Sequence, residues 1–338
     1  MSGSIILGIE SSCDDTSAAI ISGNKILSNV AANQEIHNEY GGVVPELASR
    51  AHQQNIIPVV EKAFSKANIQ QNDICAIGFT RGPGLLGSLL VGTSFAKSLA
   101  MSLDVPLIEV NHLQAHILAH FIDDANPISP TFPFLCLTVS GGHTMIVLVK
   151  DYFEMEIIGK TIDDAAGEAF DKIGKIFDLD YPAGPIIDKL AKEGNPDAFQ
   201  FNKPRMENYD YSFSGIKTSV LYFIQKEVRK NPDFIKENLN DLCASVQKSI
   251  IEILMNKLEK ASVDLNIKDV AIAGGVSANS ALRKAMEHNQ EKLGWNIFIP
   301  KFEYTTDNAA MIAMVAKLKY ERGEFTDIRT TATAKYDL

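Results

Sequence analysis

Short apolar runs alternate with polar and glycine-containing turns along the first part of the chain. Three of them, "SIILGIE", "SAAIISG" and "KILSNVAAN", follow one another closely, as strands joined by hairpins do. A helix is predicted over 45–67, followed by strand "ICAIGFT", a helix over 86–101, strand "VPLIEV" and a helix that begins after Asn111. The pattern predicts the order βββαβαβα.

The second half of the chain repeats this order. Strands "FLCLTVS", "HTMIVLVK" and "FEMEIIGK" precede a helix over 165–177, and a long helix over 234–261 precedes strand "DVAIAGG". A helix over 279–289, strand "WNIFIP" and a final helix from about Asp307 complete the repeat. The segment of about 178–235, with helical and loop character, is an insertion in this order.

Hairpin strands followed by alternating strands and helices give a mixed sheet flanked by helices. Two such halves, face to face, enclose a cleft, which is the architecture of the actin, sugar-kinase and Hsp70 superfamily (ASKHA). We therefore predict an α/β fold with actin-like domains at 1–125 and 126–310, and residues 311–338 returning to the first. In this architecture the first turn of each half, here "ESSCDDTS" and "SGGHT", holds phosphate, and a later turn, here "AGGVSAN", holds the nucleotide's sugar or base.

The net charge of −10 argues against a chain that binds nucleic acid by its bulk charge, because phosphate binding needs clustered Lys and Arg. An RNA substrate would require a local basic patch or a partner. Four cysteines without a C-x-x-C pair suit a reduced, cytoplasmic protein rather than a zinc ribbon or a disulfide framework. No apolar run is long enough to predict a signal peptide or a membrane span.

Three of the seven histidines, His112, His116 and His120, lie in "NHLQAHILAH". Residues four apart on a helix are displaced by ~40° and ~6 Å, so the first two can reach one ion. The third lies as far along again, and three side chains of one straight helix rarely meet at one metal. A polar helix face without metal is the alternative. Asp307, near the start of the last helix, would complete a common divalent-metal set, or would simply cap that helix.

Glycine-containing turns supply further candidates. Gly141 and Gly142 in "TVSGGHT" can adopt positive φ and let N–H groups approach an anion, although Gly-Gly is also an ordinary hairpin turn. "AIAGGVSANSAL" places two glycines between a buried strand and a helix that Ser277 or Asn279 could cap, and its alternative is an ordinary loop. "FTRGPGLLGS" lacks the G-K-[ST] ending of a P-loop.

Two acidic positions follow turns that lead into helices, in "TIDDAAGEAFDK" and "YPAGPIID". Acidic residues stabilise helix N-termini, which is one explanation for Asp171 and Asp188. The other is that Asp171 accepts hydrogen bonds from ligand hydroxyls, with Gly184 close to the ligand and Asp188 one turn further on.

These motifs occur in one order with "GIESSCDDTS", "GGVVPELASRAH", "GPGLLGSLLVG", "SFSGIKT" and "TDNAAMIA", over roughly residues 5–330. In that combination the chain closely resembles the TsaD family (formerly Gcp), bacterial enzymes that make N6-threonylcarbamoyladenosine (t6A) in tRNA. The resemblance implies an actin-like fold of two domains. One departure is Ala183, which stands where the family usually has the first glycine of Y-P-G-G-P and is tolerable if its φ is negative.

The resemblance also implies the site residues. The family's metal pair falls on His112 and His116 and its third ligand on Asp307, for one ion per subunit: Fe²⁺, with Zn²⁺ or another divalent ion as alternatives. His120 lies outside the metal motif, and the resemblance gives it no role. The implied substrate contacts are Thr138, Val139, Ser140, Gly141, Gly142, Asp171, Gly184, Asp188 and Asn279.

The implied reaction transfers the threonylcarbamoyl group from threonylcarbamoyl-AMP, made by a separate synthase, to tRNA. The acceptor is the N6 amine of the adenosine 3′ to the anticodon in tRNAs that read ANN codons. The nucleotide, or ATP in its place, would lie in the cleft, and Glu10 and Lys217 lie in family motifs that face it in the predicted topology. No catalytic general base is identifiable from the sequence.

The implied partners are tRNA, a shorter TsaB-like paralogue and a TsaE-like ATPase. The apolar face of "ELASRAHQQNIIPVVEKAF" is either core or a surface that packs on the paralogue. Lysines and arginines gather in "FNKPR" and "GIKTSVLYFIQKEVRK", so we predict that Lys203, Arg205 and Lys217 lie on the path of the tRNA.

Three other functions fit the residues less well. A metalloprotease, the activity in an older family name, would need H-E-x-x-H, but Leu113 follows His112. A sugar kinase would share the fold without needing a His-His-Asp set. A regulatory, non-catalytic member would not need intact metal and glycine motifs.

Overall fold

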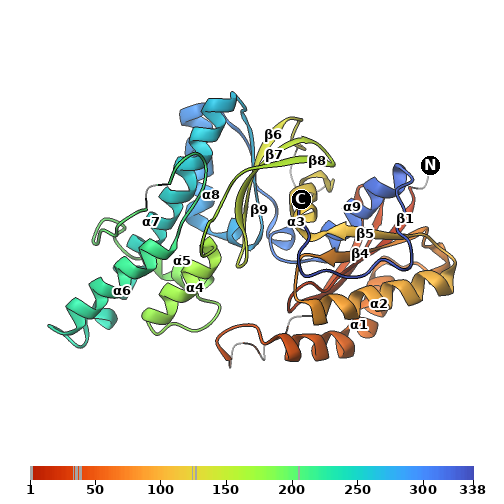
Figure 1. Ribbon diagram of the computed structural model, residues 1–338, viewed down its shortest axis with the longest axis horizontal. Helices are drawn as coiled ribbons and strands as arrows, with labels where there is room; N and C mark the ends of the chain where they lie inside the picture. Colours follow the sequence, from red (N-terminus) through yellow and green to blue (C-terminus); the bar gives the residue numbers. More distant parts are fainter. Residues whose placement is uncertain are drawn as a thin grey trace. The chain divides into compact units, whose positions relative to one another are not determined.

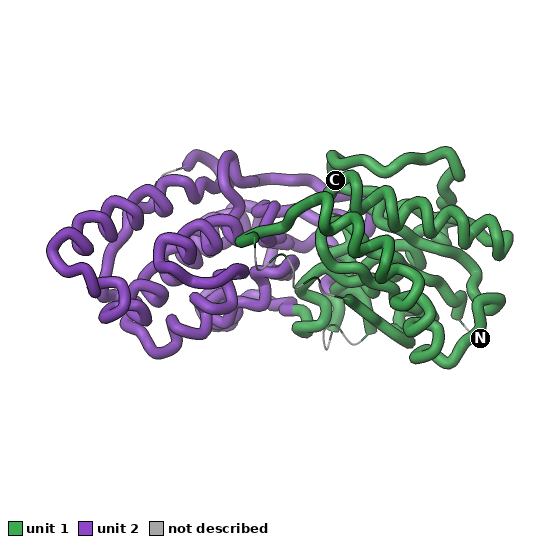
Figure 2. Tube along the Cα trace, turned by 90° about the horizontal axis from the view of Figure 1, so that it is seen from below, with its two compact units in different colours: residues 1–129, 300–338 green, residues 130–299 purple. Residues whose placement is uncertain are grey.

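The structure is a computed structural model that describes residues 3–338 apart from residues 33, 35–36, 38–39, 124, 126–127 and 205. It has two compact units, one of Met1–Ser129 with Pro300–Leu338 and one of Pro130–Ile299, coloured green and purple in Figure 2. These units are defined by their internal contacts, and the predicted domain boundaries at 125 and 310 stay a prediction.

Unit 1 is built on a five-stranded sheet of order β3-β2-β1-β4-β5, in which β1 pairs antiparallel with β2 and parallel with β4. Helices α1 and α2 cover one face of the sheet and α9 covers the other (Figure 1). The bounds are β1 (Ile5–Glu10), β2 (Thr16–Ser22), β3 (Lys25–Ala32), α1 (Pro45–Ala67), β4 (Ala76–Gly82), α2 (Leu86–Leu103), β5 (Leu107–Asn111), α3 (His112–Leu118) and α9 (Ala309–Glu321).

Helix α9 lies unusually close to the sheet of unit 1 because glycines face it. A Cβ added to Gly8 in β1 would lie 2.6 Å from the carbonyl oxygen of Ala309, and one on Gly78 in β4 would lie 2.4 Å from the Cβ of Ala316. The helix in turn is rich in alanine and almost fully buried. The start of α9, next to Asp307, is therefore fixed against the strands by backbone-level packing.

Unit 2 repeats the strand order of unit 1, as β8-β7-β6-β9-β10. The duplication predicted from the sequence is confirmed. The insertion contributes α5 and α6. The bounds are β6 (Phe134–Val139), β7 (Thr144–Asp151), β8 (Glu154–Lys160), α4 (Ala166–Ile176), α5 (Ala183–Ala191), α6 (Ser214–Val228), α7 (Phe234–Leu265), β9 (Asp269–Ala273), α8 (Ser280–Leu293) and β10 (Asn296–Phe298).

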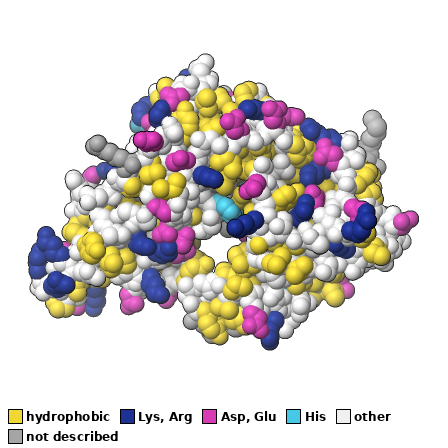
Figure 3. Space-filling view, viewed as in Figure 1, with side chains coloured by type: hydrophobic (Ala, Val, Ile, Leu, Met, Phe, Trp, Pro, Cys, Tyr) yellow, Lys and Arg dark blue, Asp and Glu magenta, His cyan; other side chains and the backbone are white. Residues whose placement is uncertain are grey.

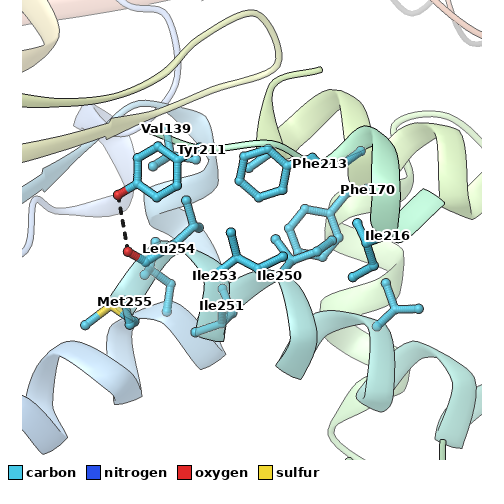
Figure 4. Packing of buried hydrophobic residues seen from close by; sticks show 14 of the residues in the cluster. Val139, Phe170, Tyr211, Phe213, Ile216, Ile250, Ile251, Ile253, Leu254 and Met255 are labelled. Carbon is cyan, nitrogen blue, oxygen red and sulfur yellow. Dashed lines mark hydrogen bonds between the residues drawn. The ribbon is translucent and has the colours of Figure 1, made fainter. Parts of the chain in front are cut away.

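The core of unit 2 joins its sheet to α4 and α7 and to the inserted segment. Figure 4 shows the rings of Phe170, Tyr211 and Phe213 lying over the apolar side of α7. The buried hydroxyl of Tyr211 donates to the carbonyl oxygen of Leu254 at 3.2 Å, so this polar group keeps a partner inside the core. The insertion is thus part of the unit's core.

The apolar length of α2 and the apolar face of α1 each raise a functional question. Within the described chain, α2 is one helix that is long and apolar enough to cross a membrane by length and composition. Its buried side chains pack against α1 and β4, so one side of the helix belongs to the core of unit 1. The apolar face of α1 is likewise core, with Ile56, Val60 and Phe64 buried, while Ile57 is 55% exposed.

Candidate metal centre and substrate-binding turns

The histidine helix α3 begins directly at the end of strand β5. The side-chain oxygen of Asn111 accepts hydrogen bonds from the backbone N–H groups of Leu113 at 2.9 Å and Gln114 at 3.1 Å, which confirms the predicted cap. His112 is the first residue of the helix and His116 lies one turn later, and both are buried. The cap therefore fixes the turn that carries the first of the two rings.

Both histidines converge on one carboxylate oxygen. Nε2 of His112 lies 3.4 Å and Nε2 of His116 lies 3.1 Å from Oδ1 of Asp307. Asp307 is not the cap of α9, because Asn308 takes that role by accepting from the N–H of Met311 at 3.1 Å. The carboxylate of Asp307 is therefore available to contact the two histidines.

The three side chains fit a divalent ion. Their ligand atoms all lie within 4.8 Å of one another. Two ligands each ~2.1 Å from an ion, at angles of about 90–110°, lie ~3.0–3.4 Å apart, which matches the two N–O distances here. Two imidazoles and a carboxylate are a frequent donor set for Zn²⁺ and Fe²⁺. Within the described part of the chain, nothing hydrogen-bonds to Nδ1 of His116, which is buried.

A fully buried carboxylate supports the first histidine from behind. Oε2 of Glu10 lies 3.1 Å from Nδ1 of His112, and Oγ of Ser12 lies 3.1 Å from the same nitrogen. The hydroxyl of Thr80 donates to Oε2 of Glu10 at 2.6 Å, and the N–H of Ser12 donates to Oε1. With Nδ1 engaged, Nε2 of His112 is directed at Asp307.

The two carboxylates shift the acid–base behaviour of the ring between them. Burial alone would lower the pKa of His112, but the charges and hydrogen bonds of Asp307 and Glu10 raise it well above its ordinary value. Burial alone would raise the pKa of Asp307, but His112 and His116 hold it well below its ordinary value. The two carboxylates therefore favour a positive charge at this position, which a proton on His112 or a bound cation can supply.

The turn between β1 and β2 carries negative charge. Burial, followed by the nearby carboxylates of Asp14, Asp307 and Glu10, raises the pKa of Asp15 to about 7. The superfamily pattern assigns phosphate to this turn, whereas so many carboxylates repel an anion and attract a cation. The phosphate role predicted for this turn stays a prediction.

His120 lies apart from this set. It belongs to the 3-10 turn Ala119–Phe121 that follows α3, and it is buried. The alternative of a polar helix face therefore does not describe this residue, because α3 ends at Leu118 and the side chain of His120 is buried. It is not among the residues whose ligand atoms converge.

The predicted anion turn of unit 2 is built differently from expectation. Gly141 and Gly142 are described residues, and neither adopts the positive φ that glycine permits, while the anion-binding role of the turn stays a prediction. The hydroxyl oxygen of Ser140 instead closes the turn by accepting from the N–H groups of Gly142 at 3.3 Å and His143 at 3.1 Å. A Cβ on either glycine would meet nothing within 4 Å, so both present open backbone to solvent.

The other turns pack around this one. Gly274 has φ of +84°, and a Cβ there would lie 2.5 Å from the carbonyl oxygen of Val139, next to the buried Thr138. The N–H of Gly167, at the start of α4, donates to the carbonyl oxygen of Ser140 at 3.2 Å. The β6–β7 turn, the loop after β9 and the N-terminus of α4 therefore form one continuous surface of unit 2.

Asp171, one of the acidic residues predicted to contact the substrate, hydrogen-bonds to the neighbouring backbone. Oδ1 of Asp171 accepts from the N–H of Ala183 at 2.8 Å, which fixes the turn that precedes Gly184. Burial raises the pKa of Asp171, although hydrogen bonds from Ala183 and Gly184 oppose the shift. Ala183 itself is the first residue of α5, and it is absent from the positive-φ residues of the described chain, so the departure from the family pattern is tolerated as expected.

Asp188 and Asn279 link α5 to α8. Oδ1 of Asp188 accepts from the hydroxyl of Ser280 at 2.7 Å and from its N–H at 3.2 Å. Asn279 caps α8, which confirms one of the two predicted caps, and donates to Oε1 of Gln247 at 2.7 Å. The hydroxyl of Ser277 is buried and has no hydrogen-bond partner within the described chain.

Two of the basic residues predicted to lie on the tRNA path are near acidic side chains. Lys203 pairs with Glu252, and Nζ of Lys217 lies 3.6 Å from Oδ2 of Asp164. Arg205 lies outside the described residues. Ser12 and Thr80 were not predicted as site residues, although Ser12 lies inside the quoted motif "GIESSCDDTS" and Thr80 inside "FTRGPGLLGS".

Comparison with known proteins places this arrangement in context. Residues 25–314 match the family model of "TsaD: tRNA N6-adenosine threonylcarbamoyltransferase". A protein of that name from Riemerella anatipestifer is 84% identical over 338 residues, covering 100% of this chain and 99% of its own. Another from Christiangramia forsetii is 61% identical over 331 residues, covering 98% of this chain and 97% of its own.

Solved structures share the fold at low sequence identity. The crystal structure of ROK hexokinase from Thermus thermophilus matches with a TM-score of 0.53 at 14% identity, covering 94% of this chain and 100% of that one. At this identity the likeness shows the fold alone. It confirms the predicted class, an actin-like duplicated α/β fold.

Proposed function

The chain belongs to the TsaD family of tRNA N6-adenosine threonylcarbamoyltransferases, and from that premise we propose the details of its reaction. It is a transferase that modifies tRNA by forming t6A. We propose threonylcarbamoyl-AMP as the donor and, as the acceptor, the N6 amine of the adenosine 3′ to the anticodon in tRNAs that read ANN codons. The amine attacks the carbamoyl carbon, AMP leaves, and the amine proton is lost.

We propose that His112, His116 and Asp307 hold one divalent ion, Fe²⁺ in the first instance. The observation that supports this most directly is the convergence of two Nε2 atoms on one carboxylate oxygen at 3.1 and 3.4 Å. When bound there, such an ion supplies Lewis acidity toward a carbonyl and a contact for a carboxylate or hydroxyl. Glu10 and Ser12 orient His112 through Nδ1, and the carboxylates of Asp307 and Glu10 give the site its negative charge.

The turns of unit 2 are proposed to bind the adenylate. Open backbone at Gly141, Gly142 and Gly275, where a Cβ would meet nothing within 4 Å, leaves room for a ligand to approach N–H groups. Asp171 and Asp188 hold the adjoining turn and helix in place while Gly184 stays open apart from one contact at 4.0 Å. Much of the rate would come from positioning two bound substrates, since we assign no general base.

These contacts argue further against the alternative functions, a metalloprotease and a sugar kinase. Glu10 contacts the nitrogen of His112 that faces away from Asp307, and Leu113 stands where a zincin-type protease has its general base. A kinase would need neither histidine. We retain a TsaB-like paralogue, a TsaE-like ATPase and a separate synthase as proposed partners, and the cytoplasm as the proposed location.

For tRNA we propose a path over the inserted segment of unit 2. Figure 3 shows Lys and Arg side chains gathered at the far end of α6, and the segment there carries Lys226, Arg229 and Lys230. Charge reversal at Lys203, Arg205 and Lys217 should weaken tRNA binding and flatten its dependence on salt. Binding that stays unchanged in a filter assay at several salt concentrations would contradict the path.

The function is tested in a strain that lacks this gene and therefore lacks t6A. Wild type should restore the nucleoside in hydrolysed tRNA analysed by mass spectrometry, whereas His112→Ala and His116→Ala should not, and purified variants should lose metal. His120→Gln serves as the matched control from the same segment and should retain both. Restoration by the His112→Ala variant would contradict the assigned metal role.

A further inference from the structure

The C-terminal segment of the chain runs along β5, an edge strand of the sheet of unit 1, and then contacts its neighbour β4. Beyond α9, the N–H of Thr326 donates to the carbonyl oxygen of Leu107 at 2.8 Å, and its hydroxyl oxygen accepts from the N–H of Glu109 at 2.7 Å. Further on, the N–H of Thr333 donates to the carbonyl oxygen of Arg81 at 2.9 Å. The segment is thus tied to β5 and then to β4.

A three-residue cluster anchors its last part. The guanidinium of Arg81 pairs with Oε2 of Glu109 at 2.9 Å and lies 4.9 Å from the centre of the Tyr336 ring. The hydroxyl of Tyr336 donates to Oε1 of Glu109 at 3.0 Å. Arg81, Glu109 and Tyr336 are each partly buried. Tyr336 contacts both of the other side chains, and these two contacts fix its position.

Asn111 joins this segment to the histidine helix. Its side-chain N–H₂ donates to the carbonyl oxygens of Tyr336 at 3.2 Å and Asp337 at 2.9 Å. Its oxygen is the cap of α3 described above. The amide is buried and uses its donors for the C-terminal segment and its acceptor for the helix, so neither can move without the other.

We propose that Thr333–Asp337 positions the metal helix through Asn111, and that Tyr336 is a positioning residue for the metal centre. This rests on the proposed metal function. With the two carbonyl contacts removed, the amide of Asn111 is free to rotate and its oxygen leaves the N–H groups of Leu113 and Gln114. The first turn of α3, which carries His112, then loses its fixed relation to Asp307.

The test compares two changes and their combination. Deleting 336–338 removes both carbonyl acceptors, and Asn111→Ser keeps a capping oxygen but is too short to reach them. Each should weaken Co²⁺ binding about 10-fold or more, as changes to groups that orient metal ligands do. Because both break the same link, the double variant should bind no more weakly than the weaker single variant. Deleting Leu338 alone keeps both acceptors and serves as the matched control.

Two readouts separate this proposal from the metal function. Co²⁺ affinity and its visible spectrum report on the metal, and hydrogen exchange of the Leu113 and Gln114 amides in metal-free protein reports on the cap. Unchanged exchange in the folded 336–338 deletion, or additive losses of affinity in the double variant, would overturn the proposal. If the 336–338 deletion speeds exchange of these amides, but His112→Ala leaves Co²⁺ binding unchanged, the link through Asn111 is supported and the proposed metal function is contradicted instead.

Discussion

Glu10 and Asp307 contact the ring of His112 from opposite nitrogens, at Nδ1 and Nε2. Two carboxylates around one imidazole stabilise its protonated form, which is why the pKa of His112 is raised well above its ordinary value in the metal-free protein. A divalent ion at Nε2 has to displace that proton. Ion binding should therefore tighten as pH rises and release a proton as it does so.

Removing the charge of Glu10 should weaken this arrangement while preserving its shape. Glu10→Gln keeps an oxygen that can accept from Nδ1 of His112 but loses the carboxylate, and we expect metal affinity to fall about 10-fold. Equilibrium dialysis against Zn²⁺ measures the loss. Glu46→Gln, an exposed helix residue of the same unit, is the control, and an equal affinity for both variants would contradict the orienting role.

At the scale of elements, the sequence predicted the strands and helices well because each has a local signal. Pro45 begins α1, Asn68 in the left-handed region ends it, and both residues are visible in the sequence at the predicted bounds. The glycine turns were harder, since Gly-Gly permits several conformations and hydrogen bonds to Ser140 decided among them. Thr80 lies in the quoted turn "FTRGPGLLGS", but its contact with Glu10 joins residues 70 positions apart, and Tyr336 contacts Asn111 and Glu109 from the far end of the chain, so no local pattern marks either contact.

The loop after β9 offers a matched pair of glycines. Gly274→Ala would place a Cβ 2.5 Å from the carbonyl oxygen of Val139 at φ of +84°, and should cost at least about 2 kcal/mol of stability. Gly275→Ala meets nothing within 4 Å and should cost about 0.5 kcal/mol or less. Urea unfolding followed by fluorescence of the single, buried Trp295 in unit 2 distinguishes them, and equal midpoints would contradict the packing.

Asp163 connects the end of β8 to the start of α6. Burial raises its pKa, but hydrogen bonds from Ser212, Phe213 and Ser214 outweigh that effect and lower it. A lowered pKa means that the carboxylate stabilises the fold above its unfolded value of about 4 and loses this effect as pH falls below it. The residue is largely exposed, so we expect only about 1 kcal/mol for Asp163→Asn at pH 7.

Thermal unfolding as a function of pH measures this contribution. At pH 7 the variant should melt ~2–4 °C below wild type, and the gap should close as pH falls below about 4. Asp264→Asn, an exposed carboxylate paired with Lys260 in the same unit, is a suitable comparison. A gap of constant size across the pH range would show that the charge of Asp163 does not matter.

At the scale of the whole molecule, the two units have separate hydrophobic cores, and all three proposed metal ligands belong to unit 1. An ion at 100 times its Kd stabilises the state that binds it by about 2.7 kcal/mol. A chelator should therefore speed hydrogen exchange in α3 and at the start of α9 while leaving unit 2 unchanged. The His112→Ala variant should not respond, and a response of equal size in it would contradict ligation by that residue.

The chain leaves unit 1 after Ser129, completes unit 2 and returns only at Pro300. During synthesis His112 and His116 therefore leave the ribosome long before Asp307 and α9 exist. Unit 2, one continuous stretch, can fold while translation is still under way. The first unit must wait for the last part of the chain, so nascent protein carries the two histidines without their carboxylate, and the proposed ion could bind its full ligand set only among the final events of biogenesis.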